Sequence, residues 1–481
     1  MDATELFCWD HYERVNLVAD PIHRYIPFTK RSESGTGTVA EEDLIDSSWV
    51  QRLRRIHQLQ AAWWVFPSGE HTRFQHSLGT MHVAGEFAGH LYESLASVCN
   101  EDIPSRAKVV ETARIAGLLH DVGHGPFGHF FDEYYLGKKW NITHETVGQS
   151  IITGPLRILI ESVTAGLHGD FAADERLSAD DIAWLIRKPQ GTEAEEKDLW
   201  LSLLRSIFCG LYTADSLDYV CRDAYMTGVS VDPVDTSRLM YYTHFRRTDP
   251  KCSMVLHLNG VSAMERFLQA RFFMYDNIYA HRTVRAIEME MRDVFEDTID
   301  RFVQENPIDD LERYLALDEW SLIHEVSNWA KNAGDQLGQC WKRIIERNPR
   351  WKRVFEMRAQ LERPLPMTRI WREDELQREI WDQLTSELRQ EVHSDDIRVD
   401  IASLHPRPEN PYLGESALEI YDPMAKRTTT EPWDRILAGI PSRAFIVRVF
   451  STSRNRAREI NEAATNLLSR DRGPERFPTN I

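Results

Sequence analysis

The stretch AGLLHDVGHGPFGHFFD, residues 116–132, places an adjacent histidine and aspartate, His120 and Asp121, directly after an apolar run. The run from Glu111 to Leu119 has the pattern of a buried helix, and Gly123 is typical of a position where a helix has ended. Adjacent imidazole and carboxylate groups at a helix end can both reach one ion, and they suit Mn, Fe, Mg and related divalent ions. An isolated His-Asp pair is a weak signal, since it also occurs as a helix-capping pair. The longer stretch is a more specific indication of a metal site.

Two more ligand-type residues flank this stretch along the chain. His76 precedes it and Asp215 follows it. With His120 and Asp121 they would give an ion three or four ligands and leave open positions for water and substrate. A divalent ion held in this way lowers the pKa of its bound water and neutralises developing charge on phosphate. These four residues are therefore candidate metal ligands.

Two rows of polar and aromatic residues are predicted on helices further along the chain. Asp215, Tyr219 and Asp223 are spaced i, i+4, i+8 and lie on one face of a helix predicted from Asp215 to Met226. A second row of this kind is formed by Arg271, Tyr275, Tyr279 and Arg282. Such rows are unusual for plain core packing, and two of them facing each other could line a pocket.

The apolar pattern predicts a mainly α fold, a helical bundle with a smaller C-terminal α+β lobe. From Leu44 to about Val392 apolar residues recur at helical spacing. Beyond that point Ile397 to Ile401 alternates between apolar and polar residues, and Ala417 to Tyr421 and Phe445 to Phe450 look like further strands. We therefore expect an N-terminal segment at residues 1–43, a helical domain at 44–392 and an α+β lobe at 393–481.

Composition narrows the class of protein. The chain has 481 residues and a formal net charge of −18, which would repel a polyanion, so no extended nucleic-acid surface is expected. A local basic pocket for a small anion is still allowed. The N-terminus is acidic, no stretch is long and apolar enough for a membrane span, and the cysteines form no C-x-x-C pair. We expect a cytoplasmic protein with no membrane partner.

Several motifs, taken together and in order, resemble the HD superfamily of phosphohydrolases, and within it the SAM-and-HD-domain dNTP triphosphohydrolases and their bacterial relatives. The resemblance covers roughly residues 15–460, and we expect no SAM domain before it. It rests on residues 20–23 (DPIH), 51–54 (QRLR), 73–79 (RFQHSLG), 120–132, 143–145 (THE), 215–219 (DSLDY), 222–223 (RD) and 279–282 (YAHR).

The resemblance implies a set of roles for residues of this chain. His76, His120, Asp121 and Asp215 would hold a divalent metal, as one ion or two. The residues implied in catalysis on the phosphate chain are His144, His124 and, as a proton relay, Asp132. Phosphate contacts are implied for Arg73, His129 and Arg271, a nucleoside contact for Tyr219, sugar 3′-hydroxyl contacts for Gln58 and Asp223, and exclusion of ribose for Leu59 and Tyr279.

The resemblance also implies assembly and regulation. In some enzymes of the family a second nucleotide site controls oligomerisation, and its guanine contacts resemble Asp46, Gln51 and Arg54 of this chain. We therefore expect a homo-oligomer and a nucleotide effector, with a dNTP as the substrate. The expected reaction converts a dNTP to deoxynucleoside and inorganic triphosphate.

Three positions depart from the family pattern. Ser216 stands where the dNTP enzymes have a phosphate-binding lysine, Thr213 stands where they have an acidic residue, and Tyr275 replaces a pocket histidine. A charge-assisted hydrogen bond contributes on the order of 1.5–3 kcal/mol, so one missing lysine can shift substrate preference. Two alternatives therefore stay open: an HD phosphohydrolase acting on another nucleotide or oligonucleotide phosphoester, and a nucleotide-binding assembly module without turnover.

Overall fold

The computed structural model describes residues 14–31, 39–188, 197–230, 234–248, 251–361, 372–404, 418–430, 433, 435–436, 440 and 443–470. Much of the predicted N-terminal segment, residues 1–13 and 32–38, lies outside these ranges. In the described part no helix is both long enough and apolar enough to cross a membrane.

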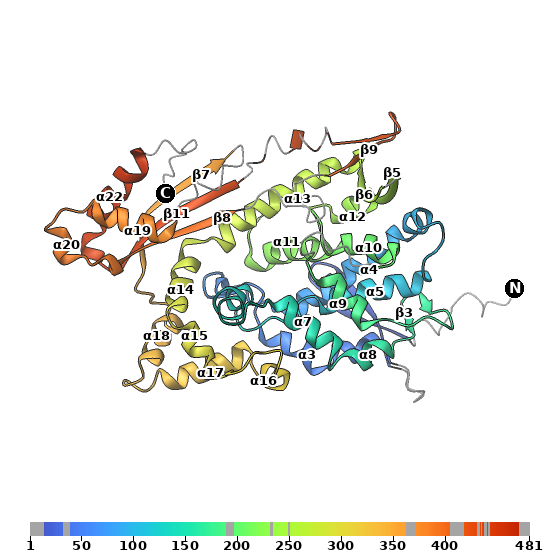
Figure 1. Cartoon of the computed structure of the whole chain (residues 1–481), viewed down its shortest axis with the longest axis horizontal. Coiled ribbons are helices and arrows are strands. Elements are labelled where there is room, and N and C mark those ends of the chain that lie inside the picture. The colour runs from blue at the N-terminus through green and yellow to red at the C-terminus, as the bar shows by residue number, and fades with distance from the viewer. Residues whose placement is uncertain are drawn as a thin grey trace.

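The larger part of the molecule is built from helices, as predicted (Figure 1). They are α2 (Glu41–Ile45), α3 (Ser48–Arg52), α4 (Arg73–Val98), α5 (Arg106–Leu119), α6 (His129–Phe131), α7 (His144–Thr153), α8 (Arg157–Glu161), α9 (Ala179–Ile186), α10 (Leu199–Leu204), α11 (Ala214–Thr227), α12 (Thr236–Tyr241), α13 (Val261–Met274), α14 (Arg282–Arg292), α15 (Phe295–Ile299), α16 (Leu311–Leu315), α17 (Glu319–Trp329) and α18 (Gln336–Ile345). Two π-helical segments, η4 (Asp132–Trp140) and η7 (Tyr275–Tyr279), continue α6 and α13.

Helices α4, α5 and α11 form the centre of this part. A Cβ atom at Gly117 of α5 would lie 2.7 Å from the carbonyl oxygen of Thr80 in α4, so glycine permits the close approach of the two helices. Thr213 caps α11 by accepting a hydrogen bond from the Ser216 amide, and Gly228 ends the helix in the left-handed conformation at φ 73°. The bounds of α11 therefore agree with the predicted helix.

Short strands accompany the helices. An antiparallel hairpin joins β1 (Val15–Asp20) to β2 (Arg24–Thr29), and a second short one joins β3 (Ala165–Gly166) to β4 (Gly169–Asp170). A four-stranded sheet has the order β10-β9-β6-β5, with bounds β5 (Thr243–Thr248), β6 (Lys251–His257), β9 (Ile420–Asp422) and β10 (Arg427–Thr429). The strand predicted near Tyr421 thus pairs with β6 of the helical part, and residue 417 lies outside the described ranges.

The C-terminal lobe lies at one end of the molecule (Figure 1). Its antiparallel sheet has the order β7-β11-β8, with bounds β7 (Lys352–Leu361), β8 (Ile397–Leu404) and β11 (Arg443–Ser451). Helices α19 (Glu373–Asp382) and α22 (Ala457–Arg470) share an apolar core with it, and α20 (Leu388–Glu391) lies between α19 and β8 in the chain. The sheet of this lobe therefore includes β7, which precedes the predicted boundary at residue 393.

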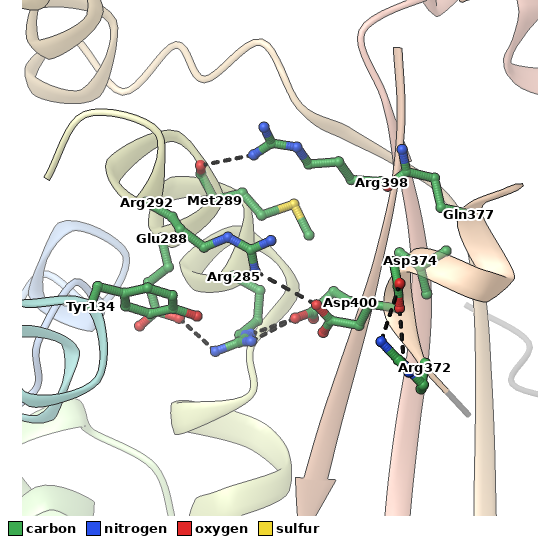
Figure 2. A pocket seen from close by; sticks show the side chains of 12 residues that line it. Tyr134, Arg285, Glu288, Met289, Arg292, Arg372, Asp374, Gln377, Arg398 and Asp400 are labelled. Carbon is green, nitrogen blue, oxygen red and sulfur yellow. Dashed lines mark hydrogen bonds and ion pairs between the residues drawn. The ribbon is translucent and has the colours of Figure 1, made fainter. Parts of the chain in front are cut away.

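Charged side chains join the two parts of the molecule (Figure 2). Arg285 of α14 contacts Asp400 of β8 through Nη2 at 2.6 Å, and its Nη1 donates to Glu288 at 2.9 Å. Arg398 of β8 donates to the carbonyl oxygen of Met289 at 3.3 Å. Because α14 follows directly on the segment that carries Tyr279, this junction connects the C-terminal sheet to the candidate site described next.

Candidate functional site

The four candidate metal ligands converge from three helices. His76 lies in α4, His120 and Asp121 follow α5, and Asp215 lies in the first turn of α11. The Nε2 atom of His76 is 3.2 Å from Nε2 of His120 and 3.0 Å from Oδ1 of Asp215. The Nε2 atom of His120 is 3.3 Å from Oδ1 of Asp121 and 3.8 Å from Oδ1 of Asp215. These distances allow one ion to reach all four groups.

Neighbouring acceptors orient both imidazole rings. The Nδ1 atom of His120 lies 2.8 Å from the carbonyl oxygen of Gly117, and Nδ1 of His76 lies 2.8 Å from Oδ2 of Asp218. A ring that donates through Nδ1 presents Nε2 as a lone pair, and acceptors of this kind usually stand behind histidines that bind metals. Two Nε2 atoms and two carboxylates suit Mn, Fe or Mg, so these residues fit a divalent ion.

The charges of the cluster favour a cation. Burial lowers the pKa of His76, but hydrogen bonds and charge interactions with Asp215 and Asp218 raise it by more, to about 10. Burial raises the pKa of Asp121, whereas the nearby His120 and Arg73 lower it to well below its usual value. The carboxylates are therefore ionised at neutral pH, and a divalent ion at this point would replace the proton on His76.

A second layer of buried charges supports His76. Besides His76, the carboxylate of Asp218 contacts Nε2 of His23 at 2.6 Å and Nε of Arg222 at 2.8 Å. Asp20, at the end of β1, contacts Arg222 from the other side at 2.7 Å. A Cβ atom at Gly79 would lie 2.0 Å from Oδ1 of Asp218, so only glycine leaves room for this network.

A second cluster of His124, His129, Asp132 and His144 lies beside the first. The rings of His124 and His144 stack with their centroids 3.6 Å apart. Oδ2 of Asp132 lies 2.5 Å from Nδ1 of His144 and 3.3 Å from Nδ1 of His129. Oδ1 of Asp121 lies 3.3 Å from Nε2 of His124, so the two clusters are in contact.

The stacked histidines differ in charge. Burial lowers the pKa of His124, and the positive charges of Arg73 and His144 lower it further. Burial also lowers the pKa of His144, but Asp132 raises it by more, so the net shift is upward. His144 is therefore the more basic histidine of the pair, and Nδ1 of its ring faces Asp132.

The cluster opens into a cavity of about 620 Å3. All eight predicted substrate-binding residues line it, namely Gln58, Leu59, Arg73, His129, Tyr219, Asp223, Arg271 and Tyr279. So do His120, Asp121, His144 and Asp215, whereas His76, His124 and Asp132 are not among the lining residues and contact them from behind. The structure thus brings the predicted metal, catalytic and substrate residues to one place.

Both predicted rows of side chains reach this cavity, with one exception. Asp215, Tyr219 and Asp223 of α11 face Arg271, Tyr275 and Tyr279 of α13 and η7. The hydroxyl of Tyr279 donates to Asp223 at 2.6 Å, and Nε of Arg271 donates to the hydroxyl of Tyr219 at 3.3 Å. Arg282 is not among the lining residues, because the helix is interrupted after Tyr279 and restarts at α14.

Two atoms at the cavity are buried polar groups without a hydrogen-bond partner. They are Oε1 of Gln58 and Nε of Arg73. Arg73 is held by an ion pair between Nη1 and Oδ2 of Asp121 at 2.5 Å. Because buried polar groups are normally paired, an orphan acceptor and an orphan donor at a cavity wall fit a polar ligand.

Comparison with known proteins agrees with this geometry. Residues 73–203 match the HD domain, and residues 234–413 match the HD associated region. The chain contains an HD domain followed by an HD associated region. Its HD domain contains His76, His120, Asp121 and the second histidine cluster, while Arg271 and Tyr279 lie in the associated region.

The relatives of this HD-domain protein include named nucleotide hydrolases. The chain is 28% identical to the uncharacterized protein YwfO of Bacillus subtilis, over 68% of this chain and 69% of that protein. It is 25% identical to the deoxynucleoside triphosphate triphosphohydrolase SAMHD1 homolog of Dictyostelium discoideum, over 64% of this chain and 55% of that protein. The match to the Dictyostelium discoideum protein, like the match to a second relative, therefore spans only about half of the relative's length.

A solved structure shares the fold. The crystal structure of a hypothetical protein from Aquifex aeolicus superposes with a TM-score of 0.67 at 23% sequence identity. The match covers 93% of this chain and 99% of that chain. The fold of this chain therefore also occurs in an experimentally determined structure.

Sequence reasoning did not select two charged residues of the cavity wall in the HD domain. Glu145 and Lys188 both line the cavity, and Lys188 Nζ lies 3.2 Å from Oε1 of Glu145. Glu145 is part of the quoted THE motif at residues 143–145, so its neighbour His144 could have pointed to it. Lys188 lies just after the end of α9 and belongs to none of the motifs that resemble the family.

The predicted effector residues lie away from the cavity of the HD domain. Gln51 donates to the carbonyl oxygen of Ile45 at 2.8 Å, and Nε of Arg54 donates to Oε1 of Gln51 at 2.8 Å. Asp46 forms an ion pair with Arg31 at 2.9 Å. Gln51 and Arg54 therefore lie together, and none of the three effector residues lines the substrate cavity.

Proposed function

We propose that this HD-domain phosphohydrolase converts deoxynucleoside triphosphates to deoxynucleosides and inorganic triphosphate. The observation that carries the proposal is the convergence of His76, His120, Asp121 and Asp215 beside the same cavity that holds the orphan atoms of Gln58 and Arg73. The name of the relative from Dictyostelium discoideum supports dNTPs as the substrate class.

The metal ligands would prepare the reacting centre. A divalent ion held by His76, His120, Asp121 and Asp215 lowers the pKa of bound water and neutralises charge on phosphate. In the proposed reaction water attacks the α-phosphorus, and the bond from that phosphorus to the 5′-oxygen of the deoxynucleoside breaks. The leaving oxygen needs a proton. Nε2 of His144 can donate it, because Asp132 occupies Nδ1 and keeps the ring protonated.

The cavity wall offers matching contacts for each part of a dNTP. Arg73, His129 and Arg271 would bind phosphate oxygens, and Tyr219 would contact the nucleoside. The sugar 3′-hydroxyl would donate to Gln58 Oε1 and approach Asp223. The side chains proposed to crowd the 2′ position and so reject ribose are Leu59 and Tyr279.

The first test is a product analysis of the purified protein. With Mn²⁺, Mg²⁺ or Fe²⁺, separate incubations with each dNTP and NTP should release triphosphate and deoxynucleoside from dNTPs, resolved by chromatography. Chelation of the metal should stop release, and Asp121→Ala protein should be inactive, because it lacks one ligand carboxylate. No release from any triphosphate, with metal bound, would assign the protein to another phosphoester. No hydrolysis of any phosphoester in a full panel would favour an assembly module without turnover.

The residues Asp46, Gln51 and Arg54 are proposed as parts of a nucleotide effector site. Light scattering of the protein with and without dGTP tests this proposal. We expect dGTP to increase the molar mass to that of a homo-oligomer, and Arg54→Ala to weaken the increase. Arg54 donates to Gln51 and covers the ring of Phe74, so its loss disturbs this surface and not the cavity. An unchanged mass would count against the effector site.

A further inference from the structure

The cavity wall contains a cationic side chain, Lys188, that has no role in the proposed reaction. Its lysine and arginine residues are Arg73, Arg271 and Lys188. The side chain of Arg73 is 3% exposed and ion-paired with Asp121, and Arg271 donates to Tyr219. The side chain of Lys188 is 76% exposed, and its ammonium group is therefore the cation most accessible to an anion entering the cavity.

The backbone before Lys188 is held in place. The carbonyl oxygen of Arg187 accepts hydrogen bonds from Nη2 of Arg205 and from the Cys209 thiol. Oε2 of Glu145 accepts the backbone N–H of Lys188 at 3.4 Å, while Oε1 of Glu145 lies 3.2 Å from Nζ. Glu145 therefore directs the Lys188 ammonium group to the side of the cavity where His144 lies.

The side chain of Ser216 is engaged in hydrogen bonds at the start of α11. The hydroxyl of Ser216 accepts the backbone N–H of Thr213 at 2.8 Å and donates to its carbonyl oxygen at 3.1 Å. These bonds belong to the cap of α11, the helix that presents Asp215. Ser216 thus supplies no cation, although it lines the cavity.

Lys188 lies in the electrostatic field of the same carboxylates. Partial burial lowers the pKa of its amine, but Glu145 and Asp215 raise it by more. The amine is therefore protonated at neutral pH. Lys188 also lines the same cavity as the candidate metal ligands Asp121 and Asp215, where the phosphate chain of a substrate would lie.

We propose that Lys188 binds the phosphate chain of the substrate and supplies the cation that position 216 lacks. Glu145 acts as the positioning residue that holds the ammonium group until an anion enters. The assignment rests on the proposed function, since it deepens the same site. It assigns substrate selection for polyphosphate over monophosphate to a residue at the end of α9.

Calorimetric titration with inorganic triphosphate, in the presence of excess Mn²⁺, measures this contact without turnover. Loss of one charge-assisted hydrogen bond weakens binding by about tenfold to a hundredfold, so we expect a change of that size in Lys188→Ala protein. Lys188→Arg protein should keep most of the affinity, because the charge remains. Lys342→Ala is the matched control, because Lys342 of α18 is half-exposed, pairs with Glu346 just after that helix and does not line the cavity.

A second readout separates phosphate binding from a structural role. Affinity for deoxynucleoside, metal content and melting temperature should be the same in Lys188→Ala and wild-type protein, while kcat/KM for dNTP falls about tenfold or more. A parallel loss of deoxynucleoside affinity would overturn the assignment, since it would mean that Lys188 shapes the cavity.

The outcomes distinguish this assignment from the proposed function. Equal triphosphate affinity of wild-type and Lys188→Ala protein overturns the role of Lys188, even if dNTPs are hydrolysed. Triphosphate binding that depends on Lys188 in a protein that hydrolyses no dNTP supports Lys188 and rejects the proposed function. Absence of triphosphate binding by the metal-loaded wild-type protein rejects the role of Lys188 outright.

Discussion

His144→Gln protein is expected to bind metal and nucleotide normally and to lose about 10²–10⁴-fold in kcat, the usual contribution of a general acid. Glutamine can still donate to Asp132 and fill the space beside His124, but it has no proton to transfer. The loss should therefore appear in kcat and leave the dissociation constant of the nucleotide unchanged. Single-turnover measurement with saturating dNTP isolates the chemical step from product release.

The dependence of the reaction rate on pH tests the same role of His144 as a general acid. A general acid must be protonated, so the rate falls as pH rises through the pKa of His144. Burial lowers this pKa and Asp132 raises it by more, so the fall should lie above the ordinary pKa range of histidine. Asp132→Asn removes the negative charge, the pKa of His144 falls, and the loss of activity should move to lower pH.

Two observations would contradict this role of His144. One is an alkaline fall in activity that stays at the same pH in Asp132→Asn protein. The other is a His144→Gln protein with near wild-type kcat. His129→Gln serves as the control, because His129 also contacts Asp132 but has a largely exposed side chain. Its substitution should leave the alkaline side of the pH profile in place.

Local sequence patterns predicted those parts of the site that depend on one helix. The i, i+4, i+8 spacing placed Asp215, Tyr219 and Asp223 on one face because a single helix carries all three. The apolar run before His120 predicted a buried helix that ends at the cluster. The position of His76 beside His120 could not be derived from a local pattern, because His76 belongs to α4 and His120 follows α5, so it was expected from the residue types and the resemblance.

Other parts of the structure depend on contacts between distant segments. Strand β7 precedes the predicted boundary of the C-terminal lobe, yet it pairs with β11 along its length. A pattern of alternating residues gives no partner for a strand, so the sequence did not assign β7 to the sheet that contains β8 and β11. Lys188 was missed for a similar reason: its role depends on Glu145 and on the loop at Cys209, which only the folded chain brings together.

The motif DPIH at residues 20–23 resembles a motif of the family, but the sequence alone did not indicate what these residues do. In the structure Asp20 and His23 both reach the charges behind the metal ligands. Asp218 is the centre of that network, since its carboxylate contacts His23, His76 and Arg222. The motif therefore acts on the site through Asp218.

Asp218→Ala is expected to destabilise the protein by about 3–5 kcal/mol, because removal of one partner leaves a buried charge uncompensated. Arg222 would keep only Asp20 as an acidic partner. The same substitution frees Nδ1 of His76, and loss of such an orienting contact typically weakens metal affinity about ten- to a hundredfold. Guanidinium unfolding measures the first effect, and competition with a metal-binding dye measures the second.

Burial is the reason for the large expected effect, so the control removes an exposed acidic partner. Arg14 and Asp170 form an ion pair with side chains 66% and 71% exposed. Asp170→Ala should change stability by less than about 1 kcal/mol and leave metal affinity unaltered. Equal small losses in both variants would mean that the charge of Asp218 does not stabilise the fold. If Asp218→Ala protein should fail to fold, Asp218→Asn keeps the size of the side chain. Unchanged metal affinity in that folded variant would show that the charge of Asp218 does not tune His76 as a ligand.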